Sequence, residues 1–338
     1  MIGGTRWRVV GAITILIAEA VGAQNSVIIA PNARFEQLFN GGFFLESPAV
    51  APDGSVYFSD LTSSSQSGMQ AGHIWRYDPR SGATAIFRSP SGMSNGITFD
   101  RNGDMIVAEG ADFGGRMITR TDMKSGRSYI LAGLYQGHPF NSPNDLAIDQ
   151  RGRIFFTDPR YLGHEPIEQP VMGIYRIDPD GAVHLIAANV WKPNGIAVSP
   201  DQKTLYIVAM GDYNANTLSA PPVTGGFSSG VHAYDLLPDG SVKYRKQLVT
   251  FPVSRWGDGM TVDTDGNLYV AVSSTAAAEN GVYVFSPEGL PVAMLPTPEG
   301  AINLDFGRGD SAKTLYVACK HGLYRIGLLR SGYRPAPQ

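Results

Sequence analysis

Six side chains that carry oxygen recur at one position of a repeated sequence unit. Each lies eight residues before the turn of its own unit, and the six are Glu46, Asn95, Asn144, Asn194, Asp258 and Asn303. Carboxylate and amide oxygens are the ligands that hard divalent cations prefer, which favours Ca²⁺, Mg²⁺ or Mn²⁺. Zn²⁺ also accepts oxygen ligands, but none of the six is a histidine. Two neighbouring carboxylates without a cation would repel each other and lose hydration.

A turn-forming role is the alternative, because Asn and Asp are common just before strands. That role predicts a mixture of Asn, Asp, Gly and Ser at the six positions. It does not predict Glu46 at the first position, since glutamate forms no Asx-turn. We therefore favour the ligand role for the six residues. For Asp145, next to Asn144, two roles stay open: a cap of the turn, or a base for catalysis.

The repeated unit itself predicts an all-β fold. Six apolar runs that resemble strands follow the turns, at residues 56–60, 105–109, 154–158, 205–209, 268–272 and 315–319. Turns such as "PDGS", "RNGD" and "TDGN" precede the runs, and a second strand that ends in a turn follows most of them. Four short strands per unit, repeated about every 45 to 65 residues, indicate a six-bladed β-propeller. A pair of β-sandwiches explains this spacing poorly.

The propeller explains how the six oxygen-bearing residues could meet. The innermost strand of each blade runs along a central channel, so equivalent strand starts should form a ring at one mouth of that channel. The last repeat ends near Ile326, before a fourth strand can form. We expect Ala33–Phe39 to supply that strand, which would close the ring and remove an open sheet edge.

Composition excludes several classes of function. The chain has 338 residues, of which 43% are hydrophobic and 17% are charged, and its net charge is −3. A globular fold is expected, without the basic surface that nucleic-acid binding requires. The single cysteine, Cys319, cannot form an internal disulfide, and its apolar surroundings predict a small buried side chain.

The N-terminus resembles a secretory signal peptide. Arg6 and Arg8 precede an apolar run, and small residues follow it at the expected cleavage site. We expect residues 1–23 to be removed and the protein to be exported, periplasmic or secreted, with no membrane association after cleavage. A retained N-terminal anchor is the alternative. The remaining chain divides into residues 24–45 with the closing strand, the propeller at 46–328, and a tail at 329–338.

Several motifs resemble the gluconolactonase/regucalcin (senescence marker protein) family of calcium-dependent six-bladed propellers. The motifs are "LESP", "SPNDLAID", "IFFTDPRY", "KPNGIAVSPDQKTLYI" and "GDGMTVDTDGNLYVA", and the resemblance covers roughly residues 33–328. It implies one divalent cation, most often Ca²⁺, with four of the six ring residues as ligands: Glu46, Asn144, Asn194 and Asp258. Asn95 and Asn303 would then support these ligands or contact substrate. Family members open lactones, most often those of sugar acids.

The chain departs from the family at positions that border the pocket. "AEGADFGGR" at residues 108–116 stands where bacterial members usually have a "CEHGNRR"-like segment, and Trp256-Gly257 precedes Asp258 where Pro is usual. Ser142 stands where the animal proteins have an arginine. We expect these departures to affect the choice of substrate more than the binding of the metal.

The resemblance leads us to expect hydrolysis of a small-molecule lactone or ester. Asp258 or Glu46 would act as the general base, with Asp145 as a rival, while Arg160, Tyr161 and Trp256 would contact substrate. Two alternatives remain: an extracellular binding module with a structural calcium ion, and a related aryl-ester or phosphotriester hydrolase.

Overall fold

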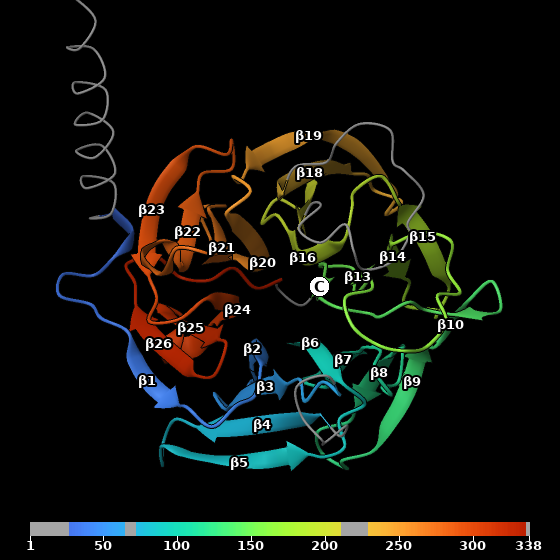
Figure 1. Cartoon of the computed structure of the whole chain (residues 1–338), viewed down its shortest axis with the longest axis horizontal. Helices are drawn as coiled ribbons and strands as arrows, with labels where there is room; N and C mark the ends of the chain where they lie inside the picture. The colour runs from blue at the N-terminus through green and yellow to red at the C-terminus, as the bar shows by residue number, and fades with distance from the viewer. Residues whose placement is uncertain (1–26, 65–71, 211–228, 336–338) are drawn as a thin grey trace, which may run out of the picture.

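The six-bladed propeller that the sequence predicts is confirmed. The structure is a computed structural model that describes residues 27–64, 72–210 and 229–335, so the predicted signal peptide lies outside the described residues. Six four-stranded antiparallel sheets surround a central axis as blades, as Figure 1 shows in the view along that axis. Within the described residues, no helix has the length and apolar character needed to cross a membrane.

In each of the first three blades, the strands follow one another from the axis to the rim. The first blade contains β2 (Leu45–Val50), β3 (Val56–Asp60), β4 (His73–Asp78) and β5 (Ala83–Arg88). The second contains β6 (Ser94–Phe99), β7 (Met105–Glu109), β8 (Met117–Thr121) and β9 (Ser128–Ala132). A small hairpin, β10 (Leu134–Tyr135) and β11 (His138–Pro139), then leads to the third blade, which contains β12 (Leu146–Ile148), β13 (Ile154–Asp158), β14 (Gly173–Ile177) and β15 (Val183–Ala187).

The last three blades repeat this order. The fourth contains β16 (Pro193–Val198), β17 (Thr204–Ala209), β18 (Gly230–Leu236) and β19 (Val242–Thr250). The fifth contains β20 (Arg255–Val262), β21 (Leu268–Ser274), β22 (Gly281–Phe285) and β23 (Pro291–Pro296), with a short 3₁₀ turn, η1 (Ala277–Glu279). The sixth contains β24 (Ala301–Phe306), a second 3₁₀ turn, η2 (Gly309–Ser311), β25 (Thr314–Cys319) and β26 (Leu323–Gly327).

An N-terminal strand completes the sixth blade, as predicted. β1 (Glu36–Phe39) pairs antiparallel with β26, and Glu36 lies opposite Arg325. The two side chains form an ion pair, with 2.8 Å between Nε and Oε2. The closing strand is shorter than the expected segment. It joins the two ends of the propeller and covers the edge that β26 would otherwise leave open.

The hydrophobic core lies between the blades. Six clusters of buried side chains occur among the described residues, and each combines residues of two neighbouring blades. Leu45 and Phe58 of the first blade, for example, pack with Tyr316 and Leu323 of the sixth. Cys319 is fully buried in the cluster between the fifth and sixth blades, which confirms its prediction as a small core residue. The blades therefore hold one another in place around the channel.

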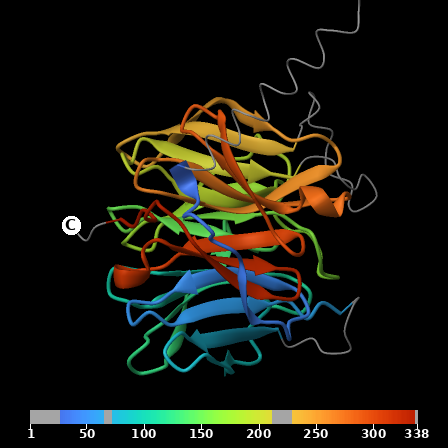
Figure 2. The same ribbon diagram turned by 90° about the vertical axis from the view of Figure 1, so that its left-hand side faces the viewer.

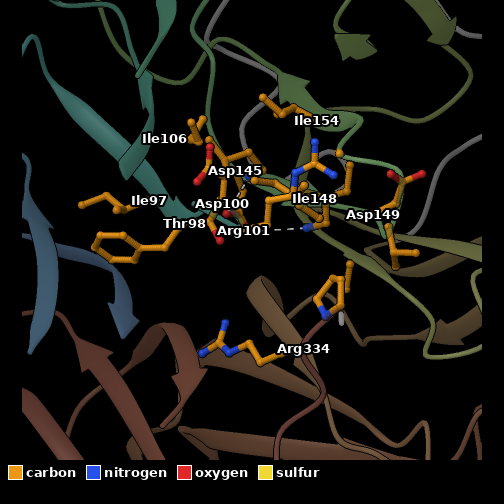
Figure 3. A pocket seen from close by; sticks show the side chains of 18 of the residues that line it. Ile97, Thr98, Asp100, Arg101, Ile106, Asp145, Ile148, Asp149, Ile154 and Arg334 are labelled. Atoms are coloured by element: carbon orange, nitrogen blue, oxygen red, sulfur yellow. Dashed lines mark hydrogen bonds between the residues drawn. The ribbon is translucent and has the colours of Figure 1, made fainter. Parts of the chain in front are cut away.

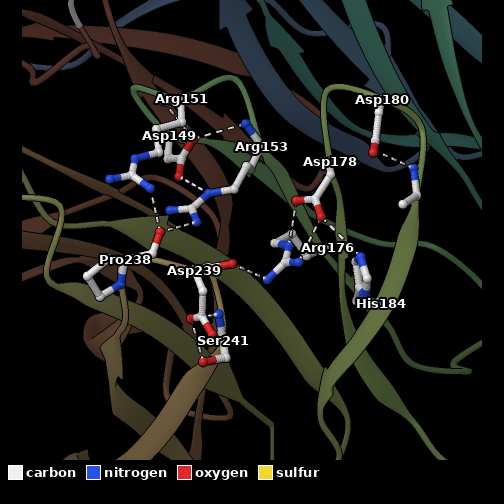
Figure 4. A network of polar contacts seen from close by, with 11 residues as sticks. Asp149, Arg151, Arg153, Arg176, Asp178, Asp180, His184, Pro238, Asp239 and Ser241 are labelled. Carbon is white, nitrogen blue, oxygen red and sulfur yellow. Dashed lines mark hydrogen bonds and ion pairs between the residues drawn. The ribbon is translucent and has the colours of Figure 1, made fainter.

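Arginines reinforce one of these blade interfaces (Figure 4). Arg153 and Arg176 of the third blade donate to the carbonyls of Pro238 and Asp239, in the turn between β18 and β19, at 3.1 and 3.0 Å. Asp149 accepts from Arg153 Nε at 2.6 Å and so fixes its orientation. These contacts join buried arginines of the third blade to an exposed turn of the fourth.

The C-terminal tail crosses one mouth of the channel. Its last described residues run toward the centre of the ring in Figure 1 and lie on one face in Figure 2. The Tyr333 hydroxyl accepts hydrogen bonds from Gln150 and Gln202, of the third and fourth blades. Arg334 is ion-paired with Asp305 of the sixth blade, at 2.5 Å. The tail therefore connects blades that are not neighbours in the sequence.

Candidate metal centre

The six ring residues lie at equivalent places in the fold. Five of them are near the start of an innermost strand, and Asn144 lies just before β12. All six are buried. A cavity of about 470 Å³, the front cavity, is lined by five of them: Glu46, Asn95, Asn144, Asn194 and Asp258. Asn303 is not among its lining residues and lines a second cavity instead.

Irregular strand pairing accompanies the ring positions. In five of the six innermost strands the register shifts by one extra residue at this point, between the pairs Glu46/Ala49, Ser94/Ile97, Pro193/Ile196, Gly257/Met260 and Ala301/Asn303. A β-bulge bends the strand and turns a side chain away from the regular alternation. The bulges explain how successive ring side chains leave the sheet face and reach the channel.

The two carboxylates of the ring, Glu46 and Asp258, lie in an environment that opposes their charge. Burial raises the pKa of Glu46 well above its usual range, and the carboxylates of Asp258 and Asp145 raise it further. Burial also raises the pKa of Asp258 to about 7, although a hydrogen bond from Asn194 acts in the opposite direction. Ionising both groups together is costly unless a positive charge is bound nearby.

The free oxygens of the ring fit a cation. Asn144 Oδ1 and Asp258 Oδ1 are buried and have no hydrogen-bond partner among the described residues. No group of three or more His, Cys, Asp or Glu side chains gathers in a metal-binding arrangement within residues 27–64, 72–210 and 229–335. The available donors are therefore two carboxylates with neutral amides, which suit a hard cation with oxygen ligands. Glu46, Asn144, Asn194 and Asp258 are the residues that would hold it.

Neighbouring side chains orient two of these four residues. Asn303 Nδ2 donates to Glu46 Oε2 at 3.4 Å and to Ser47 Oγ at 2.8 Å. Asn194 Nδ2 donates to the Tyr161 hydroxyl at 3.3 Å, and that hydroxyl donates to the Lys192 carbonyl at 3.0 Å. Because Nδ2 of Asn194 is used in this way, its Oδ1 remains available as a ligand. Asn303 thus supports Glu46 from behind the front cavity.

The predicted substrate-contacting residues divide into two groups. Asn95, Tyr161 and Trp256 line the front cavity. Arg160, in contrast, is 1% exposed and is not a lining residue. Its guanidinium donates to the carbonyls of Asn141 and Glu165, at 3.0 and 2.8 Å. Arg160 therefore holds two loop segments together, which gives no support to a substrate contact.

Asp145 has the position of a structural cap. Its Oδ1 accepts from the N–H of Leu146 at 2.9 Å, and its Oδ2 accepts from the N–H of Ile196 at 3.4 Å. Burial raises its pKa to about 7. Asp145 lines the second cavity and is absent from the lining of the front cavity. This geometry favours the cap over the base.

Sequence reasoning missed most of the wall of the front cavity. Four of its lining residues lie two positions before a ring residue: Phe44, Met93, Ser142 and Trp256. This constant offset from the ring positions is the signal that could have identified them. Of these four, Ser142 and Trp256 stand at positions that the family resemblance places at the border of the pocket, whereas Phe44 and Met93 were not predicted.

The second cavity lies at the opposite ends of the innermost strands and measures about 710 Å³ (Figure 3). It is the larger of the two, but several of its charged groups are already paired. Arg334 is paired with Asp305, and Arg120 with Asp100 and Asp104. The unpartnered ring oxygens belong to the front cavity, which is therefore the better candidate for chemistry.

Known proteins match both the sequence and the fold. Residues 46–321 match the SMP-30/Gluconolactonase/LRE-like region. A gluconolactonase of Zymomonas mobilis is 31% identical over 245 residues, which cover 71% of this chain and 64% of that protein. A lactonohydrolase of Aspergillus oryzae is 31% identical over 217 residues, which cover 61% and 48%. The chain thus spans less than two thirds of the length of either curated relative.

Among solved structures, a gluconolactonase from Xanthomonas campestris has a TM-score of 0.74 and 26% sequence identity to this protein. The match covers 90% of this chain and 92% of that one. The matched region contains all six ring positions, from Glu46 to Asn303. This chain belongs to the SMP-30/gluconolactonase/LRE-like family.

Proposed function

We propose that this protein is a metal-dependent hydrolase that opens a lactone ring at the mouth of the propeller's central channel. The observation that carries the proposal is the buried ring of Glu46, Asn144, Asn194 and Asp258 beside a cavity. Two oxygens of this ring have no hydrogen-bond partner in the part of the chain that the structure describes. The names of the related gluconolactonase and lactonohydrolase support a lactone as the substrate. Ca²⁺ is the cation that a ring of two carboxylates and neutral amides suits best.

The residues of the front cavity have distinct roles in this proposal. A bound divalent cation would supply a Lewis acid that polarises the lactone carbonyl. Asp258 or Glu46 accepts a proton from the attacking water, whose oxygen bonds to the carbonyl carbon. The ring C–O bond then breaks, and the departing alkoxide takes up the proton. Asn95, on the cavity lining, can donate a hydrogen bond to a substrate oxygen, and Tyr161 keeps Asn194 in position.

Export of the protein is part of the proposal and rests on the signal-like pattern of residues 1–23. Calcium sites of extracellular modules bind weakly compared with those of intracellular buffers. A ring with only two carboxylates is consistent with a weak site of this kind. Mass determination of the exported protein would detect removal of these residues.

Two substitutions in the ring test the assignment. Protein stripped of metal is supplied with Ca²⁺, Mg²⁺, Mn²⁺ or Zn²⁺, and ring opening of a panel of lactones is followed by pH-stat titration. Asn144→Ala and Asp258→Ala are expected to weaken cation binding and to lower kcat/KM by roughly a hundredfold or more, since both remove a ligand. Circular dichroism checks that both variants remain folded.

The outcomes separate the alternatives. The metal assignment is wrong if both folded variants bind the cation and open lactones as the wild type does. Tight cation binding without turnover of any lactone would instead indicate a binding module with a structural ion. If only aryl esters or phosphotriesters are turned over, the assignment of the site stands, but the substrate is not a lactone.

A further inference from the structure

The front cavity has apolar walls. Its lining includes Phe44, Leu61, Met93, Leu162, Met210 and Ile302. Leu162 is 40% exposed, although it lies on this concave surface. Apolar side chains that remain exposed in a pocket gain when a ligand covers them. The walls therefore favour a ligand with an apolar part.

The polar side chains of these walls are largely engaged with other protein groups. Ser142 Oγ accepts from the N–H of Ala111 at 2.9 Å, and Ser273 donates to the Ala301 carbonyl at 3.2 Å. Ser274 donates to Glu279 at 2.9 Å, and its own N–H is bound by Asn280 Oδ1 at 2.8 Å. A ligand hydroxyl placed against these walls would lose water and find few replacement partners.

The free polar atoms belong to the ring. Asn144 Oδ1 and Asp258 Oδ1 have no partner among the described residues. Asn95 also lines the cavity at a ring position. Of the described lining residues, Lys320 alone carries a positive charge, and it is exposed. Polarity is thus concentrated where the reacting ester group would lie, and the rest of the surface is mainly apolar.

We infer that the preferred substrates are lactones that carry an alkyl or aryl substituent, rather than polyhydroxylated sugar lactones. This inference rests on the proposed lactonase function and specifies its substrate class. The ester group of such a lactone would meet the ring residues, and its substituent would cover Leu162 and the neighbouring apolar side chains. A cavity of about 470 Å³ has room for a small ring with a chain of several carbons.

Three lactones with the same ring size test this inference with the wild-type, calcium-loaded protein. They are δ-valerolactone without a substituent, δ-decalactone with a pentyl chain, and glucono-δ-lactone with hydroxyls, each corrected for spontaneous hydrolysis. Each buried methylene contributes roughly fourfold in affinity, so δ-decalactone should exceed δ-valerolactone in kcat/KM by at least about tenfold. Glucono-δ-lactone should be no better than δ-valerolactone. A higher kcat/KM for glucono-δ-lactone than for δ-decalactone overturns the inference and leaves the lactonase proposal intact.

A binding measurement gives a readout that does not depend on turnover. A cyclohexanone with a pentyl substituent cannot be hydrolysed and should bind with a negative heat-capacity change, which marks burial of apolar surface. Absence of binding by calorimetry would contradict the apolar subsite. Binding of the ketone together with no turnover of any lactone would refute the lactonase proposal and support the subsite.

A matched pair of leucine variants locates the subsite. Leu162 is 40% exposed and lines the front cavity, whereas Leu237 is 42% exposed and lines neither cavity. Leu162→Ser should lower the ratio of kcat/KM for δ-decalactone to that for δ-valerolactone by roughly fivefold or more. Leu237→Ser should leave this ratio at the wild-type value. An unchanged ratio in Leu162→Ser contradicts the placement of the substituent against this wall.

Discussion

At the scale of single residues, neighbouring side chains hold some of the proposed metal ligands in place. Asn303 lies at a ring position, yet it lines the second cavity and donates to Glu46 and Ser47. Residues that orient a metal ligand commonly contribute ten- to a hundredfold to metal affinity. Asn303 is therefore a positioning residue for Glu46.

The substitution Asn303→Ala tests this role. It should lower the affinity for Ca²⁺ by about ten- to a hundredfold, because Glu46 loses a partner that fixes its carboxylate. Asn267→Ala is the matched control, since Asn267 also donates to a carboxylate, that of Asp263, at 2.7 Å in a turn of the fifth blade. The control should keep wild-type affinity in calorimetric titration. Equal affinities of both variants would contradict a positioning role for Asn303.

His232 should make the stability of the protein depend on pH. It is 1% exposed, and burial lowers its pKa to about 4. In the unfolded chain the imidazole takes up a proton near pH 6.5, so between pH 6.5 and 4 the unfolded state binds more protons. The free energy of unfolding should therefore fall as the pH drops through this window, by about 3 kcal/mol from this residue.

Urea unfolding of His232→Gln at several pH values measures this contribution. The variant should lose less stability than the wild type between pH 6.5 and 4, because glutamine does not titrate. His138→Gln, at an exposed position on β11, is the control and should retain the wild-type pH dependence. Parallel stability curves for the wild type and His232→Gln would refute the prediction.

Some residues of the site could be predicted from the sequence, and others could not. Asn194 and Asp258 were found because the distance from ring position to turn is constant across the repeats. The role of Arg160 could not be found, since its partners are carbonyls of Asn141 and Glu165 whose positions depend on loop conformation. A repeat in the sequence identifies equivalent positions in the blades. The direction of each side chain, in contrast, depends on the local backbone conformation.

At the scale of secondary-structure elements, the innermost strands approach one another closely at the ring. Glycine follows the ring residue in three blades, at Gly96, Gly195 and Gly259. A Cβ atom at Gly195 would lie 2.4 Å from the Asp258 carbonyl oxygen, and one at Gly259 would lie 2.1 Å from Asn303. These three glycines let the innermost strands of their blades pack closely against the ring residue of the next blade.

The sixth blade differs from the others, because its ring residue, Asn303, does not line the front cavity. The pairing of its innermost strand explains this difference. In β6, β16 and β20 the ring residue lies inside the irregular segment, whereas in β24 the irregularity ends at Asn303. The shift thus occurs one residue earlier in β24, and Asn303 is the ring residue that lines the other cavity. The sequence repeat predicted the innermost strands, but it did not predict where in each strand the bulge would lie.

Gly195→Ala tests the close packing of the inner strands. The new methyl group meets backbone atoms of the next blade, which cannot move aside cheaply, so the free energy of unfolding should fall by about 1–3 kcal/mol. Displacement of Asp258 should also lower the affinity for Ca²⁺. Gly327→Ala is the control, because no atom lies within 4 Å of its Cβ position. Chemical denaturation and calorimetry measure both effects, and wild-type values for Gly195→Ala would rule out this packing constraint.

At the scale of the whole molecule, the ring is closed in three ways. β1 pairs with β26, the apolar clusters join each pair of neighbouring blades, and the tail carries Tyr333 to the third and fourth blades. The sequence predicted the closing strand, because the last repeat lacked a fourth strand. It did not predict the course of the tail, which individual hydrogen bonds and an ion pair attach to residues that are distant in the sequence.

A bound cation would add a fourth closure, since its proposed ligands come from the first, third, fourth and fifth blades. The unfolded chain cannot hold these four side chains together, so Ca²⁺ should bind the folded state alone. At a free concentration of 100 times Kd, such binding raises the free energy of unfolding by about 2.7 kcal/mol. Thermal unfolding of chelator-treated protein should therefore shift upward by several degrees when Ca²⁺ is added.

Asp258→Asn distinguishes this effect from general salt stabilisation. The variant keeps the shape of the side chain and removes one of the two ring charges, so Ca²⁺ should shift its Tm little or not at all. Hydrogen exchange adds a spatial readout: in the wild type, Ca²⁺ should slow exchange at the starts of β2, β16 and β20, which carry Glu46, Asn194 and Asp258. The prediction is wrong if Ca²⁺ shifts the Tm of the wild type and of the variant equally and leaves hydrogen exchange at these strands unchanged. In that case the cation does not bind at the ring.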